Sequence, residues 1–158
     1  MSQRDEIEAI QQLKYRYFRC LDTKDWEGLA ELFVAEATSS YGDGKYSYEG
    51  REAIMEFLTE SLGRDAIMTA HFGHHPEIEL ESDDRATGTW AFEDTVIDTQ
   101  FEITIRGAGF YSDVYVKRGG DWKLLSTGYR RTFEEMESRK DRPGLRLTAS
   151  RFAPIDET

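Results

Sequence analysis

The sequence predicts an α+β fold, in which a strongly curved antiparallel sheet forms a cone-shaped barrel packed against three N-terminal helices. Two observations lead to this prediction. Apolar residues recur at helical spacing as far as Leu62, and from Ala66 almost to Phe133 they alternate with a period of two. In addition, Gly107 and Gly109 interrupt a regular strand pattern, which indicates a bulge or sharp bend of the kind that curls a sheet.

The helical part of the pattern contains three segments. The first helix is expected from Asp5 to about Leu21, with acidic residues in its first turn. Asp25 is a suitable N-cap for a second helix over Trp26–Phe33, and a third is expected from Arg51 to about Leu62. The apolar face of the first helix consists of Ile7, Ile10, Leu13, Tyr17, Cys20 and Leu21.

Strand signals begin between the second and third helices. The turn Gly42-Asp43-Gly44-Lys45 joins the short segments 37–41 and 46–48 into a predicted hairpin, because Asp-Gly supplies the positive φ angles of a tight turn. After the third helix, turn residues separate four or five strands. These are expected at Ile67–Phe72, Glu77–Glu81, Ala86–Ile97, Glu102–Lys117 and Asp121–Thr132.

The length of 158 residues fits a single domain, with a core over about 5–135 and a C-terminal tail over 136–158. This tail is too short to bury itself. It is therefore either disordered or docked on the body of the domain or on a neighbouring subunit.

Charge and composition narrow the choice of partners. A net charge of −11 and a pI near 4.8 argue against nucleic acid or an anionic membrane as the main partner. The single cysteine, Cys20, lies on the apolar helix face and is expected to be a buried core residue, in keeping with a reducing compartment. Neither a signal-peptide pattern nor a long apolar run occurs, so we expect a cytoplasmic protein with a small neutral ligand.

Tyr17 and Asp22 place a phenol and a carboxylate near the end of the first helix. Tyr17 points inward, where it is either a core residue with a satisfied hydroxyl or part of a pocket. Asp22 follows beside the same buried region, and burying a carboxylate is costly unless another group pairs with it. The sequence therefore predicts a partner for Asp22 elsewhere in the chain.

The three histidines, His71, His74 and His75, lie within five residues of one another, at the end of a predicted strand and in the turn that follows. Each is either an exposed turn residue or a functional group. Glu77 is the only carboxylate nearby in sequence, so a metal site is not expected. The favoured interpretation is one general base, because imidazole both accepts and returns a proton at cellular pH.

Two further charged residues belong to predicted strands. Asp94 is either moved to solvent by a one-residue slip in register or buried as the partner of an imidazole or guanidinium. Arg131 either lies in water at an edge or lines a pocket. The face that carries Asp94 consists of Trp90, Phe92, Asp94 and Val96.

Together these side chains form an acid–base set without a nucleophile. No serine or threonine occupies a nucleophile elbow, so a covalent acyl intermediate is not expected. A phenol can stabilise negative charge on a carbonyl oxygen while an imidazole moves the neighbouring proton. Loss of water and migration of a double bond both follow from this chemistry, and neither needs a cofactor.

Several short segments also carry a family resemblance: residues 17–22, 40–45, 71–78, 86–94, 110–113 and 128–131. Over about residues 8–135 the chain resembles the SnoaL-like, scytalone dehydratase-like proteins of the nuclear transport factor two superfold, and among them most closely the bacterial bile acid 7-alpha dehydratases. The resemblance implies an α+β cone, catalysis without metal or cofactor, and assembly into dimers or trimers. It implies catalytic roles for Tyr17, Asp22, His71, Asp94 and Arg131, and substrate-binding roles for Tyr41 and Trp90.

The predicted function is a cofactor-independent dehydratase, a hydro-lyase acting on an apolar, ring-containing hydroxy-ketone of steroid or polyketide type. The substrate is expected either free or as a coenzyme A thioester. Two alternatives remain open. One is a ketosteroid-type isomerase or polyketide cyclase that uses the same pocket, and the other is a non-catalytic module for small-molecule binding or assembly.

Overall fold

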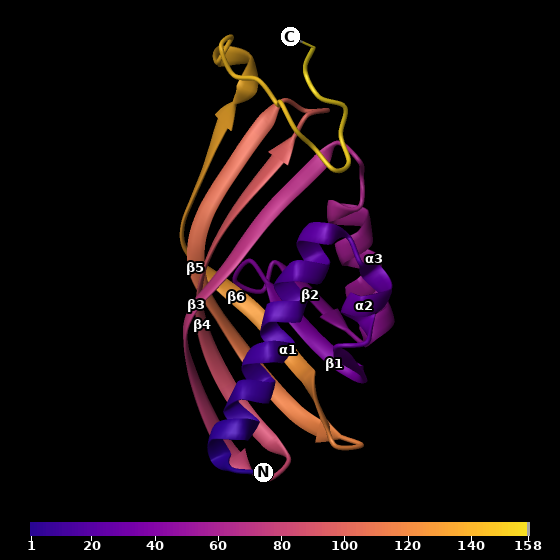
Figure 1. The fold of residues 1–158 in the computed structure, drawn as a ribbon, viewed down its shortest axis with the longest axis vertical. Helices are drawn as coiled ribbons and strands as arrows, with labels where there is room; N and C mark the ends of the chain where they lie inside the picture. Colours follow the sequence, from indigo (N-terminus) through magenta and orange to yellow (C-terminus); the bar gives the residue numbers. More distant parts are fainter. Residues whose placement is uncertain (158) are drawn as a thin grey trace.

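The computed structural model of the protein describes residues 1–157 (Figure 1). Its helices are α1 (Gln3–Thr23), α2 (Trp26–Ala30) and α3 (Arg51–Leu62), followed late in the chain by a short 3₁₀ helix, η1 (Arg139–Asp141). Its strands are β1 (Phe33–Tyr41), β2 (Tyr46–Glu49), β3 (Ile67–Ser82), β4 (Arg85–Asp98), β5 (Ile103–Arg118) and β6 (Asp121–Ser138). The α+β class is confirmed, as are the predicted third helix and the hairpin formed by β1 and β2.

Helix α1 begins and ends at strong local signals. Ser2 and Asp5 form a capping box, in which each side chain accepts a hydrogen bond from the other's backbone N–H. At the other end, Lys24 adopts the left-handed conformation with φ of 54°, and its N–H bonds back to carbonyls of the last turn. The helix is therefore two residues longer at each end than predicted.

The six strands form one curved sheet in the order β2-β1-β6-β5-β4-β3, and the three α-helices lie on one side of it (Figure 1). Two features correct the prediction. The pair β1–β6 is parallel, so the sheet is mixed, and the sheet is open because β2 and β3 are its edges. The alternation of side chains reveals strands, but it carries no information about the direction of two strands that are distant in sequence.

Two predicted elements have different bounds. Helix α2 ends at Ala30, and the chain turns into β1 at Phe33, where the strand pairs with β6. The two strands expected on either side of Gly73 are one continuous strand, β3, with an irregularity in its pairing after His74 and a left-handed φ of 46° at His75. A bulge of this kind re-aims side chains without ending the strand.

Strand β6 changes which side chains face inward along its length. Trp122 and Leu124 are buried, Leu125 is an extra residue at a register shift, and Thr127 is buried again. The shift reverses the alternation, so only part of the inner face can be read from a strict period of two. A second shift, at Gly109 of β5, confirms the predicted irregularity there.

The C-terminal part of the chain docks on the body of the domain. Strand β6 continues to Ser138, so the predicted boundary of the tail at residue 136 is wrong. Beyond it, the Ser150 hydroxyl lies 3.2 Å from Sδ of Met68, and the ammonium of Lys24 lies 4.2 Å from the centre of the Phe152 ring. Of the alternatives left open by the sequence, the structure shows docking on the body.

No helix within residues 1–157 combines the length and the apolar character that crossing a membrane requires.

Candidate active site

His71 and Asp22 form the polar centre of the site. Asp22 lies in the last turn of α1, and His71 lies on β3, which packs against that helix. Oδ1 of Asp22 is 2.7 Å from Nδ1 of the imidazole and accepts a 2.8 Å hydrogen bond from the Thr69 hydroxyl. Oδ2 accepts a 2.8 Å bond from the backbone N–H of His71. Because a carboxylate only accepts hydrogen bonds, Nδ1 carries the hydrogen, and the lone pair of the neutral ring is at Nε2.

The second ring nitrogen of His71 remains available. Within residues 1–157 Nε2 makes no hydrogen bond, and Oδ2 of Asp94 lies 4.0 Å from it. Asp94 is directly opposite His71 in the pairing of β3 with β4, and 9% of the His71 side chain is exposed. An imidazole held at one nitrogen and free at the other is suited to accept and return a proton.

Arg131 holds Asp94 with both branches of its guanidinium, at 2.7 and 2.8 Å. To do so it reaches from β6 across β5 at Gly107, where any side chain would collide with the guanidinium. Burial works to lower the pKa of Arg131, but its hydrogen bonds to Asp94 and the charge of that carboxylate raise it above the usual value. Arg131 therefore stays charged and fixes the orientation of Asp94.

Tyr17 of α1 and Tyr41 of β1 bring two phenol groups together. Their oxygens are 3.1 Å apart, and both residues are almost fully buried. Burial raises the pKa of both phenols well above the ordinary value, because it penalises the charged form. Both groups are therefore neutral at cellular pH and can donate hydrogen bonds.

A cavity of about 290 Å³ connects these groups. Its polar lining includes His71, Asp94 and Arg131. Its aromatic lining consists of Tyr17, Tyr41, Tyr46, Phe57, Tyr111 and Tyr129. The structure thus places five of the predicted site residues around one cavity, and Asp22 holds the imidazole from behind. Their roles in catalysis stay predictions.

Trp90 is the exception among the predicted site residues. It is 1% exposed, is not among the residues that line the cavity, and donates a 2.9 Å hydrogen bond to the Tyr115 hydroxyl. Trp90 shares a face of β4 with Asp94, but four residues of strand put it about 13 Å further along. This placement corrects the prediction that Trp90 contacts substrate in this cavity.

Sequence reasoning assigned no site role to four aromatic residues of the lining: Tyr46, Phe57, Tyr111 and Tyr129. Phe57 was visible as part of the apolar stripe of α3, and Tyr129 shares a strand face with Arg131. Tyr111 shares the buried face of β5 with Gly109 and Asp113. Their position in the chain carried a signal of burial but none that separates cavity wall from core.

The remaining histidines lie outside the site. His74 and His75 are exposed on β3 and its bulge, so of the three clustered histidines only His71 reaches the cavity. Within residues 1–157 no group of three or more His, Cys, Asp or Glu side chains is arranged to hold a metal ion.

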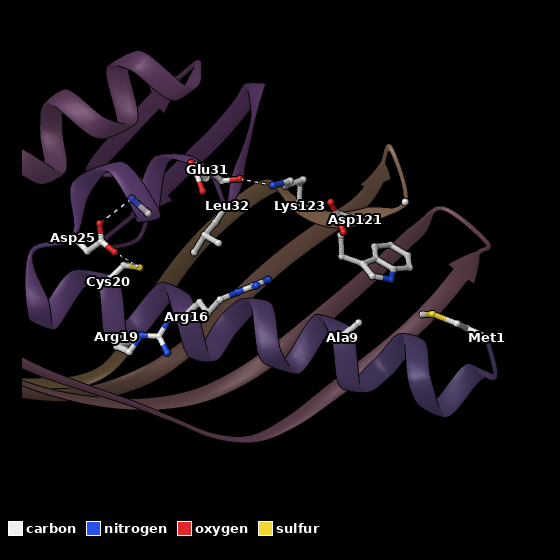
Figure 2. Close-up of a pocket in the computed structure, with 13 residues that line it drawn as sticks. Met1, Ala9, Arg16, Arg19, Cys20, Asp25, Glu31, Leu32, Asp121 and Lys123 are labelled. Atoms are coloured by element: carbon white, nitrogen blue, oxygen red, sulfur yellow. Dashed lines mark hydrogen bonds between the residues drawn. The ribbon is translucent and has the colours of Figure 1, made fainter.

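A second hollow, of about 510 Å³, lies between α1, α2 and the start of β6 (Figure 2). Some of its polar groups are engaged with each other: Asp25 accepts from the Gly28 N–H at 2.9 Å, and Lys123 donates to the Glu31 carbonyl at 2.6 Å. Cys20 lies at its floor, and burial raises the pKa of the thiol. The Cys20 thiol lies 3.9 Å from Oδ2 of Asp25, but that carboxylate caps α2 and the lining of the hollow includes no histidine. The aromatic cavity, which His71 lines, is therefore the candidate active site.

Comparison with known proteins gives a consistent picture. The model of the SnoaL-like domain family matches residues 2–127. A protein from Novosphingobium aromaticivorans DSM 12444, provisionally assigned as a scytalone dehydratase, superposes with a TM-score of 0.77 at 28% identity, over 82% of this chain and 86% of that chain.

Two further solved structures share the fold. The hexachlorocyclohexane dehydrochlorinase LinA-type3 from Novosphingobium barchaimii LL02 has a TM-score of 0.75 at 20% identity, over 84% of this chain and 90% of that one. ActVI-ORFA from Streptomyces coelicolor has a TM-score of 0.69 at 17% identity, over 81% and 98%. At these identities the likeness concerns the fold alone. The closer resemblance to bile acid 7-alpha dehydratases stays a prediction.

Proposed function

The chain belongs to the SnoaL-like domain family, and from this premise we propose that it is a cofactor-independent dehydratase. It is a hydro-lyase that removes water from an apolar, ring-containing hydroxy-ketone. The observation that carries the proposal is the single cavity in which the free Nε2 of His71 meets the neutral phenols of Tyr17 and Tyr41. These are the base and the oxyanion donors that elimination next to a carbonyl requires.

The reaction proceeds through an enolate. Nε2 of His71 removes a proton from the carbon next to the carbonyl, and the bonding electrons move onto the carbonyl oxygen, which accepts hydrogen bonds from Tyr17 and Tyr41. The enolate then re-forms the carbonyl and expels the hydroxyl group on the β carbon or at the vinylogous position. His71 returns its proton to that hydroxyl, so one C–H and one C–O bond are broken, a C=C bond forms and water leaves.

The two aspartates stabilise the imidazolium that exists between these steps. Asp22 already holds Nδ1 at 2.7 Å, and Asp94 lies 4.0 Å from Nε2. The positive charge of the imidazolium is spread over both ring nitrogens, so each carboxylate lies near part of it. Arg131 holds both carboxylate oxygens of Asp94, so this carboxylate keeps its position beside Nε2.

The lining favours an apolar ring as substrate, because six aromatic side chains surround the cavity. Its volume of about 290 Å³ is near the lower end of the range for small-molecule sites, roughly 300–1,000 Å³. One or two rings of a polyketide or steroid skeleton would be enclosed. The rest of a larger substrate, or a coenzyme A thioester, would extend through the mouth.

The proposal is tested by mass spectrometry of the purified protein, without added cofactor, after incubation with 7-hydroxy-3-oxo steroids, their coenzyme A thioesters and polyketide hydroxy-ketones. We expect one class to lose the mass of a water molecule, and we expect the loss to be absent with the His71→Ala variant. Water loss that continues at the same rate in that variant would contradict the assignment of His71 as the base.

The same experiment separates the alternatives. A product of unchanged mass but altered retention time would indicate an isomerase or cyclase, in which the enolate is reprotonated or attacks internally. Saturable binding of a panel compound without any product would indicate a binding module. Assembly as a dimer or trimer and a cytoplasmic location remain predictions, and light scattering of the purified protein tests the first.

A further inference from the structure

Lys14 is a buried charged residue that the proposed reaction does not use. It lies on the inner face of α1, next to Leu13 and one turn before Tyr17, and its side chain is 0% exposed. Its ammonium forms an ion pair at 2.8 Å with Oδ2 of Asp113 on β5, which is equally buried. A charge this deep is expensive to maintain, and an apolar pair of similar volume is often at least as stable.

The carboxylate of Asp113 is held by side chains that do not line the cavity. The Tyr115 hydroxyl donates to Oδ2 at 2.7 Å, and the Thr127 hydroxyl donates to Oδ1 at 2.6 Å. Trp90 in turn donates to the Tyr115 hydroxyl at 2.9 Å. These bonds fix the negative end of the ion pair within the network.

The positive end faces the aromatic wall of the cavity. The ammonium of Lys14 lies 3.7 Å from the centre of the Tyr111 ring, 4.4 Å from that of Tyr17 and 5.2 Å from that of Phe18. Tyr17 and Tyr111 line the cavity, whereas Lys14 does not. The two rings therefore separate the ammonium from any bound substrate, and Lys14 can influence chemistry only through them.

We propose that Lys14 is a positioning residue that acts through Tyr17: its ammonium fixes the ring and draws electron density from it, which makes the phenol a stronger hydrogen-bond donor to the enolate oxygen. A cation over an aromatic face is attracted by the electron density of the ring, and the attraction is larger where water is excluded. This inference rests on the proposed enolate chemistry.

The test replaces both ends of the ion pair, with Lys14→Met and Asp113→Asn together, because removing one end alone leaves a buried unpaired charge. Asn keeps an acceptor oxygen for Thr127. We expect the double variant to fold, to keep its KM, and to lose roughly 30-fold in kcat, the size of a desolvated cation–π interaction. In a Tyr17→Phe background the same pair of changes should have no further effect on kcat.

The chain offers a matched control in Lys117 and Glu6. This pair is also a lysine–carboxylate ion pair, at 2.6 Å, and its ammonium lies 5.5 Å from the centre of the Trp122 ring, but it does not line the cavity. Lys117→Met with Glu6→Gln should leave kcat unchanged. An equal kcat loss in the control, or the same loss with and without Tyr17, would show a structural role and overturn the inference.

A readout that needs no substrate distinguishes this inference from the proposed function. In protein labelled with ¹³C at the Cζ atom of tyrosine, the Tyr17 resonance, assigned with Tyr17→Phe, should move when the Lys14–Asp113 pair is replaced. The resonance of half-exposed Tyr46 should stay in place. An unmoved Tyr17 resonance overturns the inference whatever the activity, whereas a shifted resonance with no turnover of any hydroxy-ketone counts against the dehydratase alone.

Discussion

Two charged clusters lie inside the same curved sheet, and they differ in what their polar atoms face. Around Lys14 and Asp113 both side chains are 0% exposed, and both carboxylate oxygens accept hydrogen bonds from neighbouring hydroxyls. Around His71 the ionic groups border a cavity, and Nε2 has no hydrogen-bond partner within residues 1–157. In the first cluster both carboxylate oxygens are occupied and the ammonium does not reach the cavity, whereas the second cluster has an unused base at the cavity.

This difference shows that burial of charge does not by itself identify a catalytic group. Asp113 and Asp94 are almost equally buried, yet only Asp94 borders a space that a substrate can enter. Substitutions in the two clusters should therefore have different effects on rate and on stability. Those at the cavity should mainly lower the rate, and those around Lys14 should mainly lower stability unless charge balance is kept.

The largest expected effect is on the rate, at the cavity. His71→Ala should lower kcat by roughly 100-fold to 10,000-fold, the range for removing a general acid–base group. Because His71 is at the cavity wall, its loss should change the melting temperature little. Steady-state kinetics and thermal denaturation of the same preparation measure both. A strong loss of stability with an unchanged rate would reverse the contrast between the two clusters.

The next effect is on stability, at the other cluster. Asp113→Ala should lower the free energy of unfolding by about 3–5 kcal/mol, because it leaves the Lys14 ammonium buried without its partner. Urea denaturation measures this change. The matched substitution Asp94→Ala should cost less stability, since the guanidinium of Arg131 keeps Glu134 at 2.8 Å and is partly exposed. Equal losses of unfolding free energy in Asp113→Ala and Asp94→Ala would contradict the proposed difference between the two clusters.

A smaller effect on the rate is expected at the group that orients the base. Asp22→Asn should lower kcat by at least about 10-fold to 100-fold, the range for groups that orient metal-bound imidazoles. An amide can donate to Nδ1, which would place the hydrogen on Nε2 and remove the lone pair needed there. The control is Asp25→Asn, at the N-cap of α2, which should leave kcat unchanged.

The smallest effect per residue concerns alkaline pH. Burial raises the pKa of Tyr17, Tyr41, Tyr111 and Tyr115, so these phenols ionise more readily in the unfolded chain. Their contribution to stability is complete below the unfolded pKa of about 10 and is lost as the pH rises above it, by about 1.4 kcal/mol per pH unit for each tyrosine. Urea denaturation between pH 9 and 11 should show this slope, reduced by one tyrosine in Tyr41→Phe. An unchanged slope in Tyr41→Phe would contradict the assignment of Tyr41 as a buried phenol with a raised pKa.

Much of the fold could be predicted from the sequence, because the signals for helices, turns and strands are local. The helical spacing, the Asp-Gly turn and the change of period predicted helix α3, the β1–β2 hairpin and strands β4 and β5 closely. The parallel pairing of β1 with β6 and the continuity of β3 through its bulge could not be predicted. These features depend on contacts between distant segments.

The site was predictable to the extent that polar residues interrupt apolar patterns. Tyr17, Asp22, His71 and Asp94 all occupy such positions, and the structure brings them together. Lys14 sits at a core position of α1, but lysine is usually exposed, and its partner Asp113 is remote in sequence. Its burial could be recognised only once the helix had been placed on the sheet.

The most direct test of the central claim, that His71 and Tyr17 enolise a bound ketone, is proton NMR of 1-tetralone incubated with the protein in D₂O. This two-ring ketone has no leaving group, so the experiment measures proton removal whichever product the natural substrate yields. We predict that the protons next to the carbonyl exchange with solvent faster than in buffer, and that His71→Ala and Tyr17→Phe each slow this exchange. Exchange no faster than in buffer, or equally fast in His71→Ala, would contradict the account.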